Sequence, residues 1–469
     1  MVSFGYFARV AKRKVKPKFR RRRSVRVCKD MSRISELSDE LLITILSFLP
    51  TKVSVSTSIL SKQWKFLWMW LPNLEYSSSY HRESAALGEF IDKNLPLHRA
   101  PVIESLRLDF NFGNPHVGPE NIKRWVEISV SRNVRELEVS YDSESENIFP
   151  GSFYTCASLV ILKLEDVTLM DVPSTGCPHS LKTLKLQCLE YANLQRLLSI
   201  CPVLEELSVH FECRRHNMGG FTIIVPSLQS LSLSVADYWK FDGYVIDTPS
   251  LKYLKLEDWN GMIHYIEIED MPNLKESYVD VPCYDLKSLI GSIKSVKRLT
   301  ICSEDDLSGD GFGFNQLEHL QLCVCKQESS HLLGHLLKIS PNLRVLDISH
   351  MEYHGDDGRN KMVCWNQPSS VPECLLSSLQ ILNWSRYFGR PQDRDIAVYI
   401  LRNACHLKKA TFLADTQEYY VPDLKMLKEL TLSSRASSTC ELVFVEEYPI
   451  SDEQFKNYVF NGRLVHRNV

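Results

Sequence analysis

Residues 251–256 read Leu-Lys-Tyr-Leu-Lys-Leu, and the same spacing returns at 181–186 as Leu-Lys-Thr-Leu-Lys-Leu and at 228–233 as Leu-Gln-Ser-Leu-Ser-Leu. In an extended chain the last two leucines of each copy point to one face, while the residue between them points to the other. Each copy therefore predicts one short strand with an apolar and a polar face. Because the motif recurs along the chain, we expect the strands to stack in series.

The motif recurs with a nearly constant period. Seven steps of about 23 residues lead from Leu159 to Leu317, within the range of roughly 20 to 29 residues that leucine-rich repeats show. The predicted fold class is α/β, with a solenoid of parallel strands and helices over residues 100–364. Clear copies begin at Leu159, Leu181, Leu204, Leu228, Leu251, Leu274, Val296, Leu317, Leu343, Leu379 and Leu427, and weaker copies at Ile103, Val134 and Leu407.

Connectors between the copies have helical spacing, which is clearest in two of them. Leu194, Leu197 and Leu198 precede a Cys-Pro pair at 201–202, and four leucines between residues 332 and 337 precede a Ser-Pro pair at 340–341. Proline soon after an apolar helical pattern ends a helix, so we expect a helix in each connector. The polar stretch 354–359, which begins with His354, predicts a surface loop.

Length and charge restrict the possibilities further. A chain of 469 residues exceeds what one hydrophobic core supports, which favours several domains or a repeat array. Residues 1–29 hold twelve Lys or Arg and no acid, yet the formal net charge is −2, so the body is acidic and disfavours nucleic-acid partners. We expect residues 1–32 to form a disordered basic extension. It would act as a solvated tail or an import signal, or would be absent if translation starts at Met31.

Targeting signals and cysteine use indicate the compartment. The sequence has no run of 18 apolar residues and no apolar segment behind the basic N-terminus, so neither a membrane span nor secretion is expected. Many of the fourteen cysteines, such as Cys156 and Cys201, occupy apolar positions. Cysteines at such positions indicate small buried side chains with free thiols, which are typical of a reducing compartment. The sequence therefore predicts the nucleus or the cytoplasm.

Residues 33–76 form a helical module ahead of the repeats. Ser38 can cap a first helix, Pro50 ends it, and a second pattern follows that contains Leu60 and Leu67. About forty residues are too few to bury these side chains alone, which leaves an apolar face for a partner helix. The alternative is that the module closes the N-terminal end of the repeats. The apolar face of the first helix comprises Leu41, Leu42, Ile45, Leu46 and Leu49.

The same module resembles a plant F-box. The resemblance runs through Ile-Ser-Glu-Leu-Ser-Asp-Glu-Leu-Leu at 34–42, Ile-Leu-Ser-Phe-Leu-Pro-Thr-Lys at 45–52 and Ser-Ile-Leu-Ser-Lys-Gln-Trp-Lys-Phe-Leu-Trp at 58–68. It departs from the family at Ser38, where proline is usual. The resemblance implies a three-helix module that docks onto the Skp-type adaptor of a cullin ubiquitin ligase. The implied adaptor contacts are Leu37, Leu41, Leu42, Ile45, Leu46, Leu49, Pro50, Trp64 and Trp68.

The C-terminal region resembles the FBD module of plant F-box and leucine-rich-repeat proteins. The resemblance covers residues 365–446 and begins with Trp-Asn-Gln-Pro-Ser-Ser-Val-Pro-Glu-Cys-Leu-Leu at 365–376. Asp393 and Asp395 stand where the family usually has Glu before a helix. The resemblance implies no activity for this module, and we expect it to continue and cap the solenoid. Residues 447–469 are expected to be a tail.

The sequence does not predict a catalytic or metal site. His331 and His335 share a helix face, but Leu332 stands where a metalloprotease needs Glu, and no third ligand is evident. Cys323 and Cys325 flank one residue of a strand and are expected to point one inward and one outward. We therefore expect no cofactor, no metal and no enzymatic activity.

The polar face of the strands suggests a binding surface. The residues between paired leucines point away from the core, and neither a basic stripe nor a row of aromatic rings appears among them, which disfavours RNA and DNA. A row two positions further along includes Asp280, Cys302 and Cys323. The candidate contacts to a protein target are Lys163, Lys185, His210, Lys255, Tyr278 and Gln321.

The combined prediction is a non-catalytic, substrate-recruiting subunit of an SCF-type ubiquitin ligase. It would bind a Skp-type adaptor, and through it a cullin, and would hold an unknown protein target near the transferred ubiquitin. Two alternatives remain open: an adaptor-bound scaffold that recruits no substrate, and a receptor of the same architecture that needs a small molecule.

Overall fold

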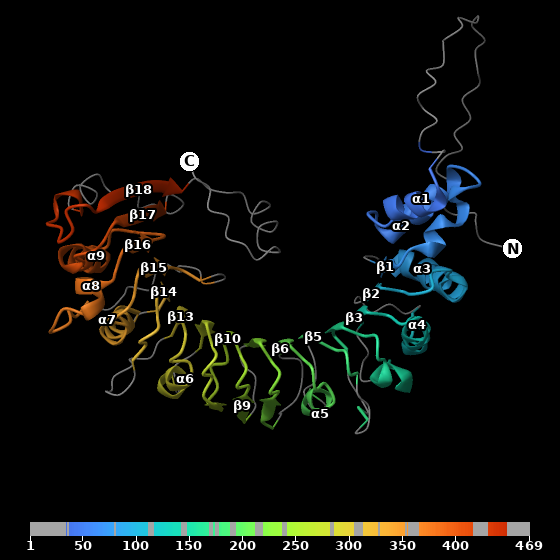
Figure 1. The fold of residues 1–469 in the computed structure, drawn as a ribbon, viewed down its shortest axis with the longest axis horizontal. Helices are drawn as coiled ribbons and strands as arrows, with labels where there is room; N and C mark the ends of the chain where they lie inside the picture. Colours follow the sequence, from blue (N-terminus) through green and yellow to red (C-terminus); the bar gives the residue numbers. More distant parts are fainter. Residues whose placement is uncertain are drawn as a thin grey trace, which may run out of the picture.

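The computed structural model is an open arc built on one long parallel sheet (Figure 1). Strands line the inner, concave side of the arc and helices lie along its outer side. The structure describes residues 34, 37–78, 81–110, 117–141, 148–167, 172–173, 178–187, 194–211, 219–236, 242–281, 286–303, 313–326, 329–351, 354, 365–415 and 430–447. The predicted extension at 1–32, and all but the first residue of the predicted tail at 447–469, lie outside these ranges.

The long sheet confirms the predicted repeats. Neighbouring strands are parallel, and leucines of successive copies stand in register, as where Leu231 pairs with Leu254. Leu254 and Leu256 are fully buried, while Lys255 between them faces the concave side and is partly exposed. The strands in spatial order are β1 (Asn73–Ser77), β2 (Ser105–Asp109), β3 (Glu136–Ser140), β4 (Ile161–Glu165), β5 (Thr183–Gln187), β6 (Glu206–Phe211), β8 (Ser230–Val235), β10 (Tyr253–Asp258), β12 (Glu276–Asp280), β13 (Arg298–Cys302), β14 (His319–Cys323), β15 (Val345–Ser349), β16 (Ile381–Trp384), β17 (Lys409–Asp415) and β18 (Glu441–Glu447).

A row of polar side chains ties successive repeats together. In each case the residue just before the first leucine of a copy donates a hydrogen bond to a backbone carbonyl of the preceding repeat. Ser227 Oγ lies 2.7 Å from the Leu204 oxygen, and Ser295 Oγ lies 2.7 Å from the Met271 oxygen. We call this row the Ser/Asn ladder, and it comprises Ser158, Ser180, Ser227, Asn273, Ser295, Asn342 and Ser378.

Not every connector is helical. Between β6 and β12 the connectors form a second, three-stranded parallel sheet of β7 (Phe221–Ile224), β9 (Gly243–Asp247) and β11 (Tyr265–Ile268). Their β-branched and aromatic residues favour extended chain, which explains the departure from the predicted helices. Gly243 has a φ of +144°, and a Cβ there would overlap the backbone oxygen of Tyr265, so only glycine fits.

The two helical connectors with the clearest spacing are confirmed, as α5 (Leu194–Ser199) and α7 (Ser329–Ile339). None of the helices in the described residues is long and apolar enough to cross a membrane. The other outer helices are α3 (His81–Asn94), α4 (Pro119–Ser131), α6 (Leu286–Ser292), α8 (Glu373–Ser377) and α9 (Pro391–Asn403), with short 3-10 turns η6 (Leu95–Leu97) and η7 (Gly151–Thr155).

The predicted repeat at Leu427 is wrong. Leu430 is buried and Leu432 is 83% exposed on a helical turn, whereas a strand would point both to one face. The next strand is instead β18, which pairs directly with β17. The segment that resembles the FBD module therefore continues the solenoid as predicted, by adding strands β16 to β18 at the C-terminal end of the sheet.

The N-terminal module contains α1 (Asp39–Leu46), α2 (Thr51–Ser56), η4 (Thr57–Ile59) and η5 (Trp64–Trp70). Ser38 occupies the N-cap of α1 as predicted, but its side chain makes no capping hydrogen bond. The predicted second helix, which contained Leu60 and Leu67, is a 3-10 helix that begins only at Trp64, and α2 and η4 precede it. The module runs directly into β1, the first strand of the long sheet, so it is joined to the array without a linker.

Candidate functional site

The structure divides the predicted adaptor contacts into two groups. Leu42 and Leu46 on α1 are 0% exposed, and Trp64 and Trp68 on η5 are also buried. The helix α1 packs against η5, and all four side chains belong to the continuous core of the chain. In the folded chain these four side chains support the module from inside, and their role as adaptor contacts stays a prediction.

The other predicted contacts remain on the surface. Leu41 is 52% exposed, Ile45 and Leu49 are also exposed, Pro50 is exposed, and Leu37 is half-buried. Ten of the twenty-one exposed large hydrophobic side chains in the described residues lie between 34 and 70. We define the N-terminal apolar surface as Leu41, Ile45, Phe48, Leu49, Val53, Ile59 and Leu60.

Four residues of this surface were absent from the predicted contacts: Phe48, Val53, Ile59 and Leu60. Phe48, Ile59 and Leu60 are strongly exposed, and all three stand where a helix ends or turns. The helical spacing that identifies α1 does not extend to them. A large apolar residue in a turn, where polar residues are usual, is the signal that could have identified them.

Hydrogen bonds hold the module in place. Gln63 Nε2 donates to the Leu37 carbonyl at 3.1 Å and to Asp39 Oδ1 at 3.0 Å, which fixes the start of α1. The backbone N–H of Glu75 on β1 donates to Thr51 Oγ1 at 2.9 Å, which ties α2 to the sheet. The module that carries the apolar surface is therefore hydrogen-bonded to the first strand of the array.

The concave face carries the predicted target contacts, and its lysines are paired. Lys163 Nζ lies 2.8 Å from Glu136 Oε1, and this hydrogen bond raises the pKa of Lys163. Lys185 lies 3.2 Å from Glu206, and Lys255 lies 2.8 Å from Glu257. The acids come from the same or the adjacent strand, so the face is a lattice of matched charges with no basic stripe.

The remaining predicted contacts also join this lattice. Lys255 Nζ stands 5.1 Å from the centre of the Tyr278 ring, and burial raises the pKa of Tyr278 well above its ordinary value. Gln321 Nε2 donates to Ser349 Oγ at 3.0 Å. His210 lies half-buried on β6. The six residues lie along successive strands and do not converge on one pocket.

A buried polar cluster follows β10. Asp258 Oδ2 accepts from the Tyr244 hydroxyl at 3.1 Å and lies 2.7 Å from His264 Nε2, while Asp258 Oδ1 accepts from the Asn260 N–H at 3.0 Å. Burial lowers the pKa of His264, but the hydrogen bond to Asp258, the charge of Asp258 and the hydrogen bond to the Met262 carbonyl together outweigh burial, so the net pKa is raised. The cluster anchors the chain between the two sheets.

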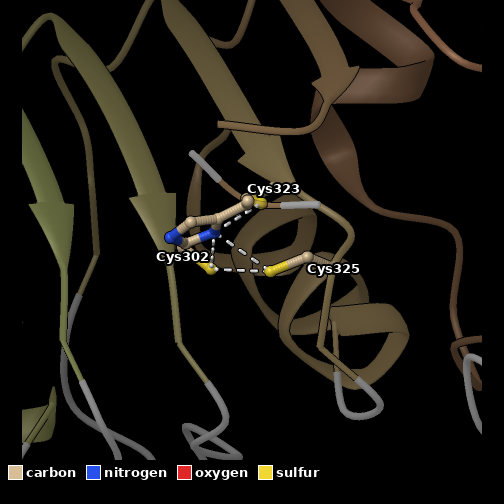
Figure 2. Close-up of side chains that lie close together, drawn as sticks. Cys302, Cys323 and Cys325 are labelled. Carbon is tan, nitrogen blue, oxygen red and sulfur yellow. Dashed lines mark hydrogen bonds between the residues drawn. The ribbon is translucent and has the colours of Figure 1, made fainter. Parts of the chain in front are cut away.

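Two predictions about the concave face are wrong. Cys323 and Cys325 do not point in opposite directions, because the strand ends at Cys323 and both thiols are buried (Figure 2). His354 does not stand on a surface loop, since its side chain is only 13% exposed and contacts the same thiols. Residues 355–359 of the predicted loop lie outside the described residues.

Comparisons with known proteins match three segments of the chain. The F-box domain model matches residues 34–76, the model for the repeats of FBD-associated F-box protein At5g56370 matches 122–278, and the FBD model matches 367–412.

Relatives in Arabidopsis thaliana match nearly end to end. FBD-associated F-box protein At5g38590 is 60% identical over 405 residues, covering 85% of this chain and 98% of the relative. FBD-associated F-box protein At4g10400 is 55% identical over 422 residues, covering 88% and 100%. Among solved structures, the complex of Rad7 and Elc1 in yeast gives a TM-score of 0.28 at 11% identity, covering 71% of this chain and 95% of that one.

Proposed function

The chain belongs to the family of FBD-associated F-box proteins, and from this membership we propose that it is the substrate-recruiting subunit of an SCF-type ubiquitin ligase. In this role the N-terminal module binds a Skp-type adaptor, which connects the chain to a cullin. The repeat array holds a protein target. Transfer of ubiquitin is carried out by other subunits, so this chain needs no catalytic residue.

The N-terminal apolar surface is the observation that carries the proposal. Phe48 and Ile59 are 83% and 89% exposed, and they belong to the same N-terminal module as the exposed Leu41 and Ile45 of α1. A monomeric protein rarely leaves so many large apolar side chains together in water, and such patches mark sites of protein association. Leu42 and Trp64 are buried in the continuous core of the chain, whereas the residues of the apolar surface contribute little to that core.

The concave face supports a protein target better than a nucleic acid. Its lysines are already paired with acids, and the described body has no cationic row that would track a phosphate backbone. Acidic and basic side chains of a protein target could replace one partner in each of these ion pairs. Holding such a target on the array raises its local concentration near the ubiquitin donor, which is how a non-catalytic subunit accelerates the transfer.

A substitution on the apolar surface tests adaptor docking. We expect Leu41→Asp with Ile45→Asp in the full-length chain to weaken adaptor binding by about a hundredfold or more, because two carboxylates would be desolvated in the interface. Both positions are exposed, so the fold should survive. Binding is measured by titration of the purified adaptor.

Leu97→Asp is the matched control, since Leu97 is 64% exposed but lies beyond the module on η6. It should bind the adaptor like the wild type. If the double variant folds and binds undiminished, the assignment of this surface is refuted. Loss of ubiquitination of co-purified proteins in the double variant would favour substrate recruitment; unchanged ubiquitination would favour the scaffold alternative.

A further inference from the structure

Three cysteines and one histidine converge on the concave face near the C-terminal half of the arc. Cys302 ends β13, Cys323 ends β14, Cys325 follows two residues later, and His354 follows β15. Figure 2 shows the three thiols turned toward one another. Their sulfur atoms and a ring nitrogen of His354 all lie within 4.8 Å of one another.

The distances fit a single tetrahedral ion. Zn–S bonds of roughly 2.3 Å and Zn–N bonds of roughly 2.0 Å require ligand atoms to stand about 3.3 to 3.8 Å apart at the corners of a tetrahedron. His354 Nδ1 lies 3.1 Å from Cys325 Sγ and 3.5 Å from each of the other two sulfurs. Cys302 Sγ lies 3.4 Å from Cys325 Sγ.

A second layer of contacts orients the histidine. His354 Nε2 lies 2.9 Å from Asp280 Oδ2 on β12, and a carboxylate there holds the ring proton on Nε2. The Nδ1 lone pair then faces the three sulfurs. Asp280 Oδ2 also accepts from Trp259 Nε1 at 2.7 Å, which fixes the carboxylate. A carboxylate behind a histidine is the arrangement that commonly supports a zinc ligand.

Burial separates this group from the leucine core. Cys302 and Cys323 are 0% and 1% exposed, and together with Cys325 and Met351 they form a small cluster of their own. The Met351 N–H donates to Cys323 Sγ at 3.4 Å, as backbone groups do toward thiolates. Apolar side chains would fill this space at a lower free-energy cost than three cysteines and a histidine, because they bury no polar group. Packing alone therefore does not explain why these four residues are here.

We propose that Cys302, Cys323, Cys325 and His354 bind one Zn²⁺ in a tetrahedral, structural site. Three thiolates and one imidazole suit zinc among the common divalent ions. All four positions are supplied by the chain, which leaves no place for a catalytic water. On binding, each thiol releases its proton to solvent and forms one Zn–S bond, so three protons leave for each ion.

The site would fasten the chain after β15 across the concave face. His354 and Cys302 are 52 residues apart in sequence, and Asp280 lies a further strand away on β12. The ion therefore connects the ends of β13 and β14 with the segment that follows β15. It also lies beside Tyr278, a predicted target contact, so zinc would fix the surface against which a target docks.

Metal analysis of the full-length chain tests the proposal. We expect about one zinc per chain after purification in reducing buffer, and an intense thiolate-to-metal absorption band when Co²⁺ replaces it. Cys302→Ser with Cys325→Ser should lower the zinc content below a tenth of the wild-type value. Asp280→Asn should weaken Zn²⁺ binding by about tenfold or more, since it removes only the support behind His354.

Two controls keep the test decisive. Cys156→Ser changes a thiol that is also buried but lies far from the cluster, and it should keep its zinc. His354→Ala removes a ligand from outside the strands, so the array should stay folded by circular dichroism while the metal is lost. A wild-type chain that neither carries nor binds zinc overturns the proposal, and so does a disulfide between Cys302 and Cys325 in the reduced preparation.

Discussion

At the scale of single residues, Asp258 is a buried carboxylate on which we expect the stability of the fold to depend strongly. It is 1% exposed, and three donors surround its carboxylate, from Tyr244, Asn260 and His264. A buried carboxylate is stable in the interior only when each of its oxygens accepts a hydrogen bond, as both oxygens of Asp258 do. Its position at the end of β10 couples the long sheet to β9 of the small sheet.

We expect Asp258→Asn to destabilise the chain by about 2 to 4 kcal/mol, because the amide cannot replace a charge that pairs with His264 in the interior. Thermal unfolding followed by circular dichroism measures the loss. The exposed Asp242, which also lies between the two sheets in sequence, provides the control as Asp242→Asn. A melting temperature equal to the wild type would show that the cluster contributes no stability.

The same pair predicts a pH dependence. Asp258 raises the pKa of His264 in the folded chain, so the pair contributes its full stability below the pKa of the unfolded histidine, near 6.5. That contribution is lost as pH rises through the folded-state pKa. The difference in melting temperature between wild type and Asp258→Asn should therefore shrink with increasing pH above about 6.5. A constant difference over that range would contradict it.

At the level of elements, the repeat strands were predictable, whereas the connectors were predictable only where helical spacing was clear, as in α5 and α7. The leucines at positions such as Leu254 and Leu256 define both the strand and its register, because only one face can be buried. The connectors have no such constraint. Short apolar runs such as Phe-Thr-Ile-Ile at 221–224 read equally well as helix or strand by spacing alone, and pairing with β9 decided them.

The Ser/Asn ladder also belongs to this scale. Ser295 Oγ bonds to carbonyls of Met271 and Leu274 at 2.7 and 3.3 Å, so it joins two neighbouring repeats. Ser295→Ala should cost about 1 kcal/mol by leaving these groups unpaired, measured as a lower midpoint in urea. Ser152→Ala, at an exposed position on η7, should leave the midpoint unchanged. Equal midpoints for the two variants would remove the ladder as a source of stability.

The proposed zinc cluster was not predicted from the sequence because of the way its ligands are spaced along the chain. Its ligands come from three repeats, with one residue between Cys323 and Cys325 and 28 between Cys325 and His354, and no familiar zinc spacing has this form. A different feature of the sequence, the position of residues within the repeat, did indicate that these side chains meet. Asp280, Cys302 and Cys323 occupy the same position in three successive repeats, so a parallel array had to bring them side by side.

For the whole molecule, the N-terminal module is an extension of the array. Its core and the repeat core form one cluster, and the Trp68 ring makes a tilted contact with Phe90 of α3, with ring centres 5.5 Å apart. The sequence identified the module by its helical spacing. It could not distinguish Leu41 from Leu42, because a helix packed on one side and open on another has apolar residues on both.

A continuous core predicts coupled unfolding. Leu74 on β1 is 2% exposed, and Leu74→Asp should lower both the stability of the array and the affinity for the adaptor, although it lies outside the apolar surface. Hydrogen exchange should show the amides of β1 and β2 opening together in the wild type. Independent opening of the two strands would mean that the module behaves as a separate domain.

The direct passage from the module into β1 has a geometric consequence. In the function proposed above, and with no linker between the module and β1, the orientation of a bound target relative to the adaptor would be set by how many strands separate them. Inserting or deleting one repeat would turn the target by one step about the axis of the arc. A different set of the target's lysines would then face the incoming ubiquitin. The number of repeats would therefore determine which lysine of the proposed target is modified.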